Sequence, residues 1–149
     1  MMTKLVYLDV CALNRPFDDQ KQVRIRLETD AVNLIVSHIR TATLRLVTSP
    51  MLEIEISANP NENVKAYNRS LLQQWGYMPN YALSAIRTRA EFLSELNMGA
   101  ADAAHVAFAE FAEADFVTVD DRLLKLCRRL NIRVWYGTPL AFCDKEDLR

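Results

Sequence analysis

The sequence predicts an α/β fold, a three-layer α/β/α sandwich around a central parallel sheet of four or five strands. Short apolar runs alternate with segments whose apolar residues recur every three or four positions, the pattern of strands joined by helices. Only three glycines and five prolines occur in 149 residues, so few long loops are expected. With 50% hydrophobic and 25% charged residues, we expect one packed domain over residues 1–149.

The expected strands are short runs rich in apolar and β-branched residues. They cover residues 4–8, 43–48, 115–119 and 133–136. Because helices separate them, right-handed crossovers would make the strands parallel and place helices on both faces of the sheet. The long stretch between the second and third of these strands is expected to be a helical insertion.

The expected helices follow from apolar spacing and from capping residues. They cover residues 21–40, 51–57, 61–74, 81–96, 100–113 and 122–130, whereas residues 14–19 and 75–79 are expected as a loop and a break. Ser49 and Pro50 mark a helix start, because Ser caps helix N-termini and Pro suits the first turn. Helical spacing predicts two buried stripes, which consist of Leu27, Ala31, Leu34, Ile35 and His38 in one helix and Ala104, Ala107, Phe108 and Phe111 in another.

Overall charge and cysteine usage exclude several classes of protein. The net charge is -1 and the pI is about 6.1, so binding to a phosphate backbone would need a local basic patch. Cys11, Cys127 and Cys143 are odd in number and lack C-x-x-C spacing, which indicates neither a disulfide framework nor a zinc site. We see no signal peptide and no apolar run long enough to span a bilayer, and therefore expect a cytoplasmic protein with no membrane partner.

Acidic residues stand where the expected strands end. Asp9 follows the strand 4–8, and Asp120 and Asp121 follow the strand 115–119. Ligands of open α/β sheets bind outside the carboxyl ends of the strands, so acids from both strands are expected to meet there. One of Asp120 and Asp121 is expected to cap the next helix and leave the other for chemistry.

Two further acids are expected at the same edge of the sheet. Glu55 lies in the helix after the second strand, and Asp102 begins an alanine-rich helix. Glu53 and Glu55 are two residues apart on a helix, so only one of them can face the strand ends. Each acid alone has an ordinary explanation, such as the preference for acids in a first helical turn. Together, carboxylates without His or Cys match the oxygen ligands of magnesium or manganese.

These residues, in this order, resemble the PIN-domain family of metal-dependent ribonucleases, which includes the VapC-type toxins. Residues 7–19 resemble the first acidic motif, with the Asn-Arg-Pro-Phe extension of a bacterial subgroup, and residues 52–60, 102–107 and 116–124 resemble the other three. The resemblance implies a PIN-like fold and hydrolysis of RNA. It also implies one or two Mg²⁺ or Mn²⁺ ions held by four acids, Asp9, Glu55, Asp102 and Asp120.

Three polar residues are expected to bind the substrate. Arg15 follows the first acid on the expected loop and is the best candidate for a phosphate contact. Thr118 either hydrogen-bonds near the site or is an ordinary strand residue. Many family members have Asn or Ser two residues after the first acid, where this chain has Cys11, a weaker hydrogen-bond partner. Asn14 is expected to replace part of that support.

The resemblance implies partners as well as a reaction. It implies an RNA substrate, a role as the toxin of a type II toxin–antitoxin pair with a small antitoxin protein as partner, and a homodimer. The alternative that remains open is a non-catalytic module of the same fold that binds RNA or a protein, because Cys11 departs from the family pattern. A phosphotransfer receiver is disfavoured, since Lys145 lies beyond the last expected strand.

Overall fold

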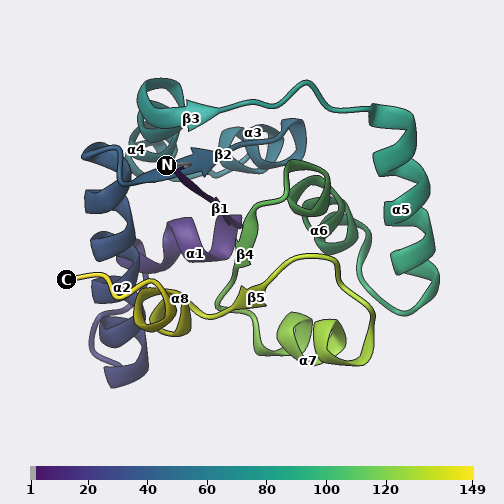
Figure 1. The fold of residues 1–149 in the computed structure, drawn as a ribbon. Coiled ribbons are helices and arrows are strands. Elements are labelled where there is room, and N and C mark those ends of the chain that lie inside the picture. The colour runs from purple at the N-terminus through teal and green to yellow at the C-terminus, as the bar shows by residue number, and fades with distance from the viewer. Residues whose placement is uncertain (1–2) are drawn as a thin grey trace.

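The centre of the molecule is one five-stranded sheet in which every pair of neighbouring strands is parallel (Figure 1). The computed structural model describes residues 3–149. The strands are β1 (Lys4–Leu8), β2 (Leu44–Val47), β3 (Gly76–Tyr77), β4 (Asp115–Val117) and β5 (Tyr136–Gly137). Their spatial order is β3-β2-β1-β4-β5, so the chain first builds the sheet to one side of β1 and later to the other. The order therefore reverses between β1 and β4, where α/β sheets bind ligands.

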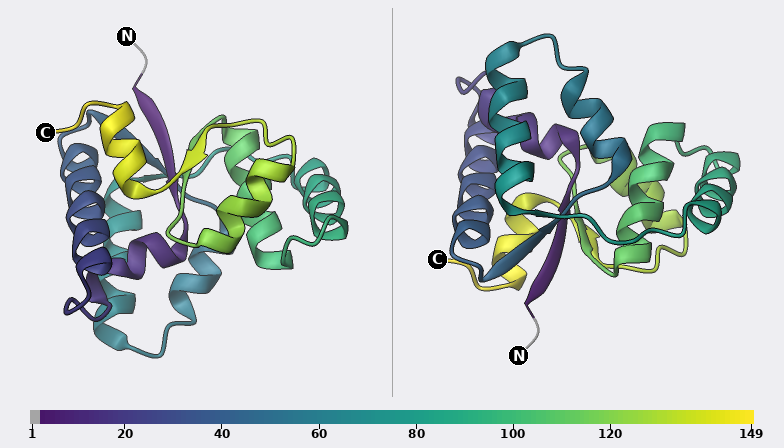
Figure 2. Two further views of the ribbon diagram at one scale, coloured as in Figure 1. Left: turned by 90° about the horizontal axis from the view of Figure 1, so that it is seen from below. Right: turned by 90° about the horizontal axis from the view of Figure 1, so that it is seen from above.

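Helices cover both faces of the sheet, which confirms the predicted three-layer architecture (Figures 1 and 2). The helices are α1 (Val10–Asn14), a 3-10 helix η1 (Arg15–Phe17), α2 (Val23–Arg40), α3 (Pro50–Ser57), α4 (Glu62–Trp75), α5 (Leu83–Glu95), α6 (Ala100–Ala112), α7 (Asp121–Arg129) and α8 (Pro139–Lys145). Residues of α1, α2, α3, α4 and α8 share one apolar core, and residues of α5, α6 and α7 share the other. Helix α5 lies outside α6, at the rim of the molecule (Figure 2).

Strand β1 connects the two cores because its side chains alternate between the faces of the sheet. Val6 and Leu8 belong to the core beneath α2, and Tyr7 belongs to the core beneath α6. All three side chains are fully buried. Burying a large apolar side chain contributes about 1.5–3 kcal/mol, so both layers are fixed to the same central strand.

The structure differs from the sequence-based expectation at the short elements. Residues 75–79 do not simply break the chain, because β3 pairs with β2 there and divides the expected helical insertion. The expected loop 14–19 contains the end of α1 and all of η1, the last strand lies at residues 136–137 instead of 133–136, and α8 was not expected. A strand of two residues, paired on one side only, is too short to produce an apolar periodicity.

Two predicted helix faces are partly wrong. In α2, Leu27 is 49% exposed, and the buried stripe also contains Ile25, Val32, Val36 and Ile39. In α6, Ala107 and Phe108 are buried as predicted, whereas Phe111 is 43% exposed. Helix α6 is packed between the sheet and α5, so apolar residues occur nearly all round it and spacing alone does not select one stripe.

The C-terminus of α6 gives a test of backbone strain. Glu113 ends this helix in the left-handed region, at φ 55° and ψ 40°. This conformation costs a residue with a side chain about 1–2 kcal/mol and costs glycine little. We expect Glu113→Gly to raise the free energy of unfolding by up to about 1 kcal/mol, after the greater freedom of glycine in the unfolded chain is included.

Urea denaturation of both proteins would measure the change, with Glu91→Gly as the matched control. Glu91 is exposed in the middle of α5, where glycine should lower the free energy of unfolding by about 1 kcal/mol. An equal loss of stability in the two variants would contradict the assignment of strain to Glu113.

Candidate metal centre

Asp9 is fixed at the carboxyl end of β1 by its backbone and by one side-chain oxygen. Its N–H donates to the carbonyl oxygen of Val117 at 3.2 Å, which ties the residue to β4. Its Oδ1 accepts hydrogen bonds from the N–H of Ala12 at 3.1 Å and from Cys11 Sγ at 2.9 Å, so Asp9 caps α1. The side chain is buried, and burial raises the pKa of Asp9, while the bonds from Cys11, Thr118 and Ala12 lower it.

Asp120 follows β4 and caps α7 in a similar way. Its Oδ1 accepts from the N–H of Arg122 at 3.0 Å and from that of Leu123 at 3.2 Å. Its own N–H donates to Oγ1 of Thr118, a fully buried residue. The same Oγ1 lies 3.3 Å from Cys11 Sγ. Thr118 therefore connects the two acid-bearing segments. Asp120 is thus both the cap of α7 and the expected metal ligand. The sequence instead predicted that Asp120 and Asp121 would divide these two roles.

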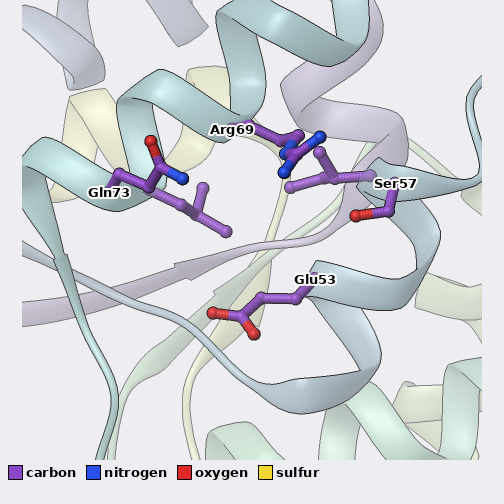
Figure 3. A pocket seen from close by; sticks show the side chains of 6 residues that line it. Glu53, Ser57, Arg69 and Gln73 are labelled. Carbon is purple, nitrogen blue, oxygen red and sulfur yellow. The ribbon is translucent and has the colours of Figure 1, made fainter.

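Glu55 follows the capping Ser49 in α3 and lies on the side of this helix that approaches α6. It is half-buried, and its Oε1 contacts Nε2 of His105. Glu53 is exposed and lines a cavity of about 210 Å³ between α3 and α4, together with Ser57, Arg69 and Gln73 (Figure 3). The two glutamates thus face different surroundings, as helical geometry predicts, and Glu55 is the one that faces the other acids.

Asp102 stands in the first turn of α6, where it is half-buried and its side chain makes no hydrogen bond with the residues that the structure describes. Burial is the main cause that raises its pKa, followed by the negative charges of Asp120 and Asp9, and Glu55 adds to the effect. The other three acids therefore all lie close enough to Asp102 for their negative charges to disfavour its ionised form.

The four carboxylates are gathered without forming a ready-made chelate. Over residues 3–149, no three His, Cys, Asp or Glu side chains lie close enough together to bind a metal ion as they stand. The hydrogen bonds of Asp9 and Asp120 converge on Oδ1, and the His105 contact of Glu55 uses Oε1. Asp9, Asp120 and Glu55 therefore each keep one carboxylate oxygen for a ligand, and Asp102 keeps both of its carboxylate oxygens. This all-oxygen donor set fits Mg²⁺ or Mn²⁺.

Comparisons with known proteins identify the fold and nothing narrower. No family model and no curated protein matches the sequence. Among solved structures, FitAcB from Neisseria gonorrhoeae is 18% identical over 91% of this chain and 98% of its own, with a TM-score of 0.53. FitAB bound to an IR36 DNA fragment is 16% identical over 90% and 94% of the chains, with a TM-score of 0.57. The FitB component has a PIN-like fold. The two matches cover nearly the whole length of the matched chains.

The protein has a PIN-domain fold. This confirms the fold that the resemblance implied. In the structure, the charges of Asp120, Asp9 and Glu55 all act on Asp102, so the acids of the four expected motifs lie near one another. Identities below 20% identify the fold alone. No helix in residues 3–149 is long and apolar enough to cross a lipid bilayer.

A chain of buried hydrogen bonds supports Glu55 in this PIN fold. The N–H of Leu52 donates to Ser49 Oγ at 3.1 Å, Ser49 Oγ lies 2.6 Å from the Tyr7 hydroxyl, and that hydroxyl lies 2.6 Å from His105 Nδ1. Because burial raises the pKa of Tyr7 well above its ordinary value, the hydroxyl keeps its proton. With a neutral imidazole, every contact has one donor when Ser49 donates to Tyr7, Tyr7 donates to His105 Nδ1, and His105 Nε2–H donates to Glu55.

His105 is therefore a packed, hydrogen-bonded residue that orients an acid. The sequence offered one signal for this role. His105 comes three residues after Asp102, which places both on the same side of α6. Its partners Tyr7 and Ser49 come from β1 and from the start of α3, so only the folded chain shows the connection.

The structure places the expected substrate-binding residues in different settings. Thr118 lies inside the acidic site, as described above. Arg15 lies beside it, where its guanidinium is paired with Glu28 and Asp18. Asn14 Oδ1 accepts a hydrogen bond from Asn68 Nδ2 at 2.9 Å and does not contact Asp9, so it does not replace the polar support of the first acid. Cys11 itself provides that support, because burial raises the pKa of its thiol and keeps it a donor.

Tyr7→Phe tests the buried chain. The substitution removes one hydroxyl and leaves Ser49 Oγ and His105 Nδ1 without their shared partner in the core. We expect the free energy of unfolding to fall by about 1–3 kcal/mol, the cost of leaving buried polar groups unpaired. Urea denaturation would measure it.

The matched control is Tyr136→Phe. The hydroxyl of Tyr136 makes no hydrogen bond with residues 3–149, so this variant should change stability by less than about 0.5 kcal/mol. If both phenylalanine variants were as stable as the parent protein, the buried chain would have no energetic role.

Proposed function

We propose that this protein is a metal-dependent endoribonuclease that hydrolyses RNA phosphodiester bonds. The observation that carries the proposal is the proximity of the other three acids to Asp102, since the charges of Asp120, Asp9 and Glu55 all raise the pKa of Asp102. Crowded carboxylates at the point where the strand order reverses are a destabilising arrangement without a cation. The PIN-domain fold supports the same reaction, because the motifs that carry these acids resemble those of that family.

The chain's own residues would divide the work at this site. Asp9, Glu55, Asp102 and Asp120 would hold one or two Mg²⁺ or Mn²⁺ ions, which supply an activated water and stabilise charge on the attacked phosphate. Cys11 and Thr118 orient Asp9 and the segment of Asp120, and His105 orients Glu55. These contacts fix which oxygen of each acid remains for the ion. Arg15 is the proposed phosphate contact.

We also propose that the protein acts as the toxin of a two-component pair. The matched structures are complexes named FitAcB and FitAB, and one of them is bound to DNA. By this likeness, the chain would bind a small antitoxin protein and form a homodimer. Copurification of this chain with the product of a neighbouring gene, and loss of RNA cleavage in that complex, would support the proposed pairing.

Asp9→Asn and Asp120→Asn test the proposed metal chemistry while preserving the fold. Asn caps helices about as well as Asp, so both variants should remain folded. Each loses one charge and one metal-binding oxygen. We expect manganese-dependent RNA cleavage to fall by at least about a hundredfold, and EDTA to abolish cleavage by the parent protein. Circular dichroism would verify folding, and gel assays of RNA would measure the rates.

Glu55→Gln and Glu53→Gln form a matched pair on α3. Glu55 faces the other acids, and Glu53 faces the separate cavity. Millimolar Mn²⁺ should raise the melting temperature of the parent protein and of the Glu53 variant, because an ion that binds only the folded chain stabilises it. The Glu55 variant should show a smaller rise. If Mn²⁺ shifted none of the three proteins, a non-catalytic module of the same fold would be the better interpretation.

A further inference from the structure

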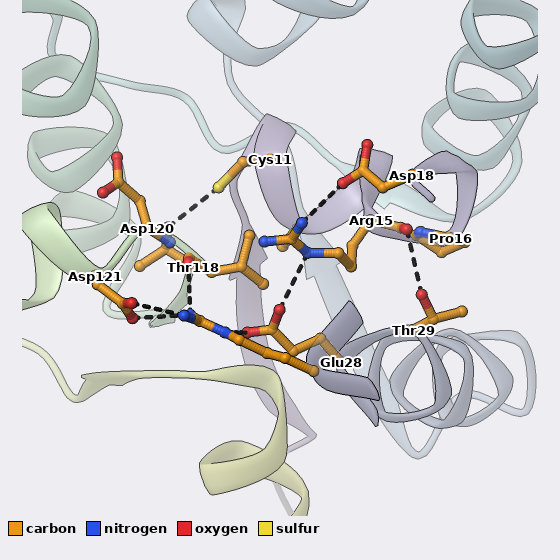
Figure 4. Close-up of polar contacts among 12 residues, drawn as sticks. Cys11, Arg15, Pro16, Asp18, Glu28, Thr29, Thr118, Asp120 and Asp121 are labelled. Carbon is orange, nitrogen blue, oxygen red and sulfur yellow. Dashed lines mark hydrogen bonds and ion pairs between the residues drawn. The ribbon is translucent and has the colours of Figure 1, made fainter. Parts of the chain in front are cut away.

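A second group of charges lies beside the acidic site and has a buried carboxylate at its centre (Figure 4). Glu28, on α2, is only 3% exposed. Its Oε1 lies 3.1 Å from Nε of Arg15, and its Oε2 lies 3.4 Å from Nε of Arg24. The contact with Arg15 is an ion pair without the alignment of a hydrogen bond. A carboxylate buried so deeply requires opposite charge, so both arginines stabilise Glu28.

Arg24 makes contacts through all three of its nitrogens, although its side chain is 55% exposed. Its Nη1 donates to Asp121 Oδ2 at 2.7 Å, and its Nη2 donates to Asp121 Oδ1 at 2.9 Å and to the carbonyl oxygen of Val119 at 3.4 Å. Asp121 and Val119 are the two neighbours of Asp120 in the chain. Arg24 therefore fixes α2 to the segment that carries the fourth acid, and four of its five N–H donors are engaged within the protein.

Arg15 is used at two of its three nitrogens. Its Nε is paired with Glu28, and its Nη1 donates to Asp18 Oδ2 at 3.0 Å. Its Nη2 makes no hydrogen bond with the described part of the chain. Figure 4 shows the guanidinium extending from η1 toward the side on which Cys11, Thr118 and Asp120 lie. The planar end of Arg15 thus points to the acidic site.

The two carboxylate partners of Arg15 differ in how easily they can be exchanged. The side chain of Asp18 is 43% exposed, and the side chain of Glu28 is 4% exposed. An exposed ion pair contributes little to stability because water solvates both charges well. Breaking a buried pair leaves an uncompensated charge and is strongly unfavourable. Another anion can therefore replace Asp18 on Arg15, whereas Glu28 stays in place.

We infer that Glu28 is a positioning residue that holds Arg15 for an RNA phosphate, and that Asp18 occupies the place of that phosphate in the free protein. The inference rests on the proposed function, because it assigns the phosphate to an RNA chain at the acidic site. A carboxylate offers two oxygens to the guanidinium fork, as a phosphate does, so Asp18 and the phosphate compete for the same donors.

RNA binding measured apart from cleavage tests the inference. All variants carry Asp9→Asn so that the RNA remains intact, and the probe is a fluorescently labelled single-stranded RNA of mixed sequence in Mg²⁺ buffer. Asp18→Asn should bind this RNA about two- to fivefold more tightly, since an exposed competitor is removed. Its affinity should also depend more steeply on salt, by about 0.7 in the logarithmic slope for one added phosphate contact.

Two other single-charge variants separate position from charge. Asp19→Asn is the matched control, because Asp19 is adjacent, its Oδ1 accepts from the N–H of Lys21, and it is not paired with Arg15. It should change the affinity by less than about 1.5-fold at physiological salt. Glu28→Gln removes the same charge as Asp18→Asn but should weaken binding about fivefold or more, because Arg15 loses its buried partner.

The results that would overturn the inference are definite. They are equal effects of Asp18→Asn and Asp19→Asn, tighter binding by a folded Glu28→Gln, or no RNA binding by any variant. If Glu28→Gln does not fold, a double-mutant cycle of Asp18 and Arg15 tests the inference instead. The gain in RNA affinity from Asp18→Asn must vanish when Arg15→Gln is also present. Persistence of the gain in that background would show that Asp18 acts without Arg15.

Failure of the proposed function would be seen separately. Proteins with Asp9 restored are assayed for Mn²⁺-dependent cleavage of the same RNA. The expected binding pattern without cleavage would reject the nuclease and retain the role of Glu28. Cleavage without the binding pattern would reject the role of Glu28 and retain the nuclease.

Discussion

The pairing of β1 with β4 is the constraint on which the rest of the structure depends. Leu8 lies opposite Val117, and the N–H of Asp9 donates to the Val117 carbonyl oxygen, so strands more than a hundred residues apart in sequence end side by side. This register places the first acid beside the fourth. It also determines where α1 and α7 begin, because each helix is capped by one of these acids. Local helix capping and the shared acidic site are therefore consequences of one strand pair.

Bringing negative charges together is unfavourable, and the fold limits their freedom with polar contacts from several elements. Asp9 is held by α1 and by Cys11, Asp120 by α7, and Glu55 by His105, in each case through one oxygen. These contacts restrain Asp9, Asp120 and Glu55, and each of the three keeps an oxygen that is free to bind a cation. Outside this group, Arg24 and Glu28 form a second set of charges that fixes the segment around Asp120.

The sequence predicts the parts of this arrangement that depend on neighbours in the chain. Ser49 and Pro50 start α3 as expected, and Glu53 and Glu55 face different ways because helical geometry requires it. The positions of the acids at strand ends follow from short apolar runs. The sequence does not predict β3, whose two residues carry no periodicity. It also does not predict the role of Glu28, whose partner Arg24 is bonded in turn to Asp121, 97 residues further along the chain. Such contacts depend on tertiary packing, and a single sequence contains no local signal for them.

The position of α5 has a consequence for local stability. This helix packs on α6 at the rim of the molecule, with Leu83 61% exposed and Phe92 51% exposed, and α6 separates it from β1 and β4. Helices with few buried contacts open by local fluctuation more readily than the core does. The amide hydrogens of α5 should therefore exchange with solvent deuterium ahead of those in β1 and β4, through openings that leave the central strand pair intact.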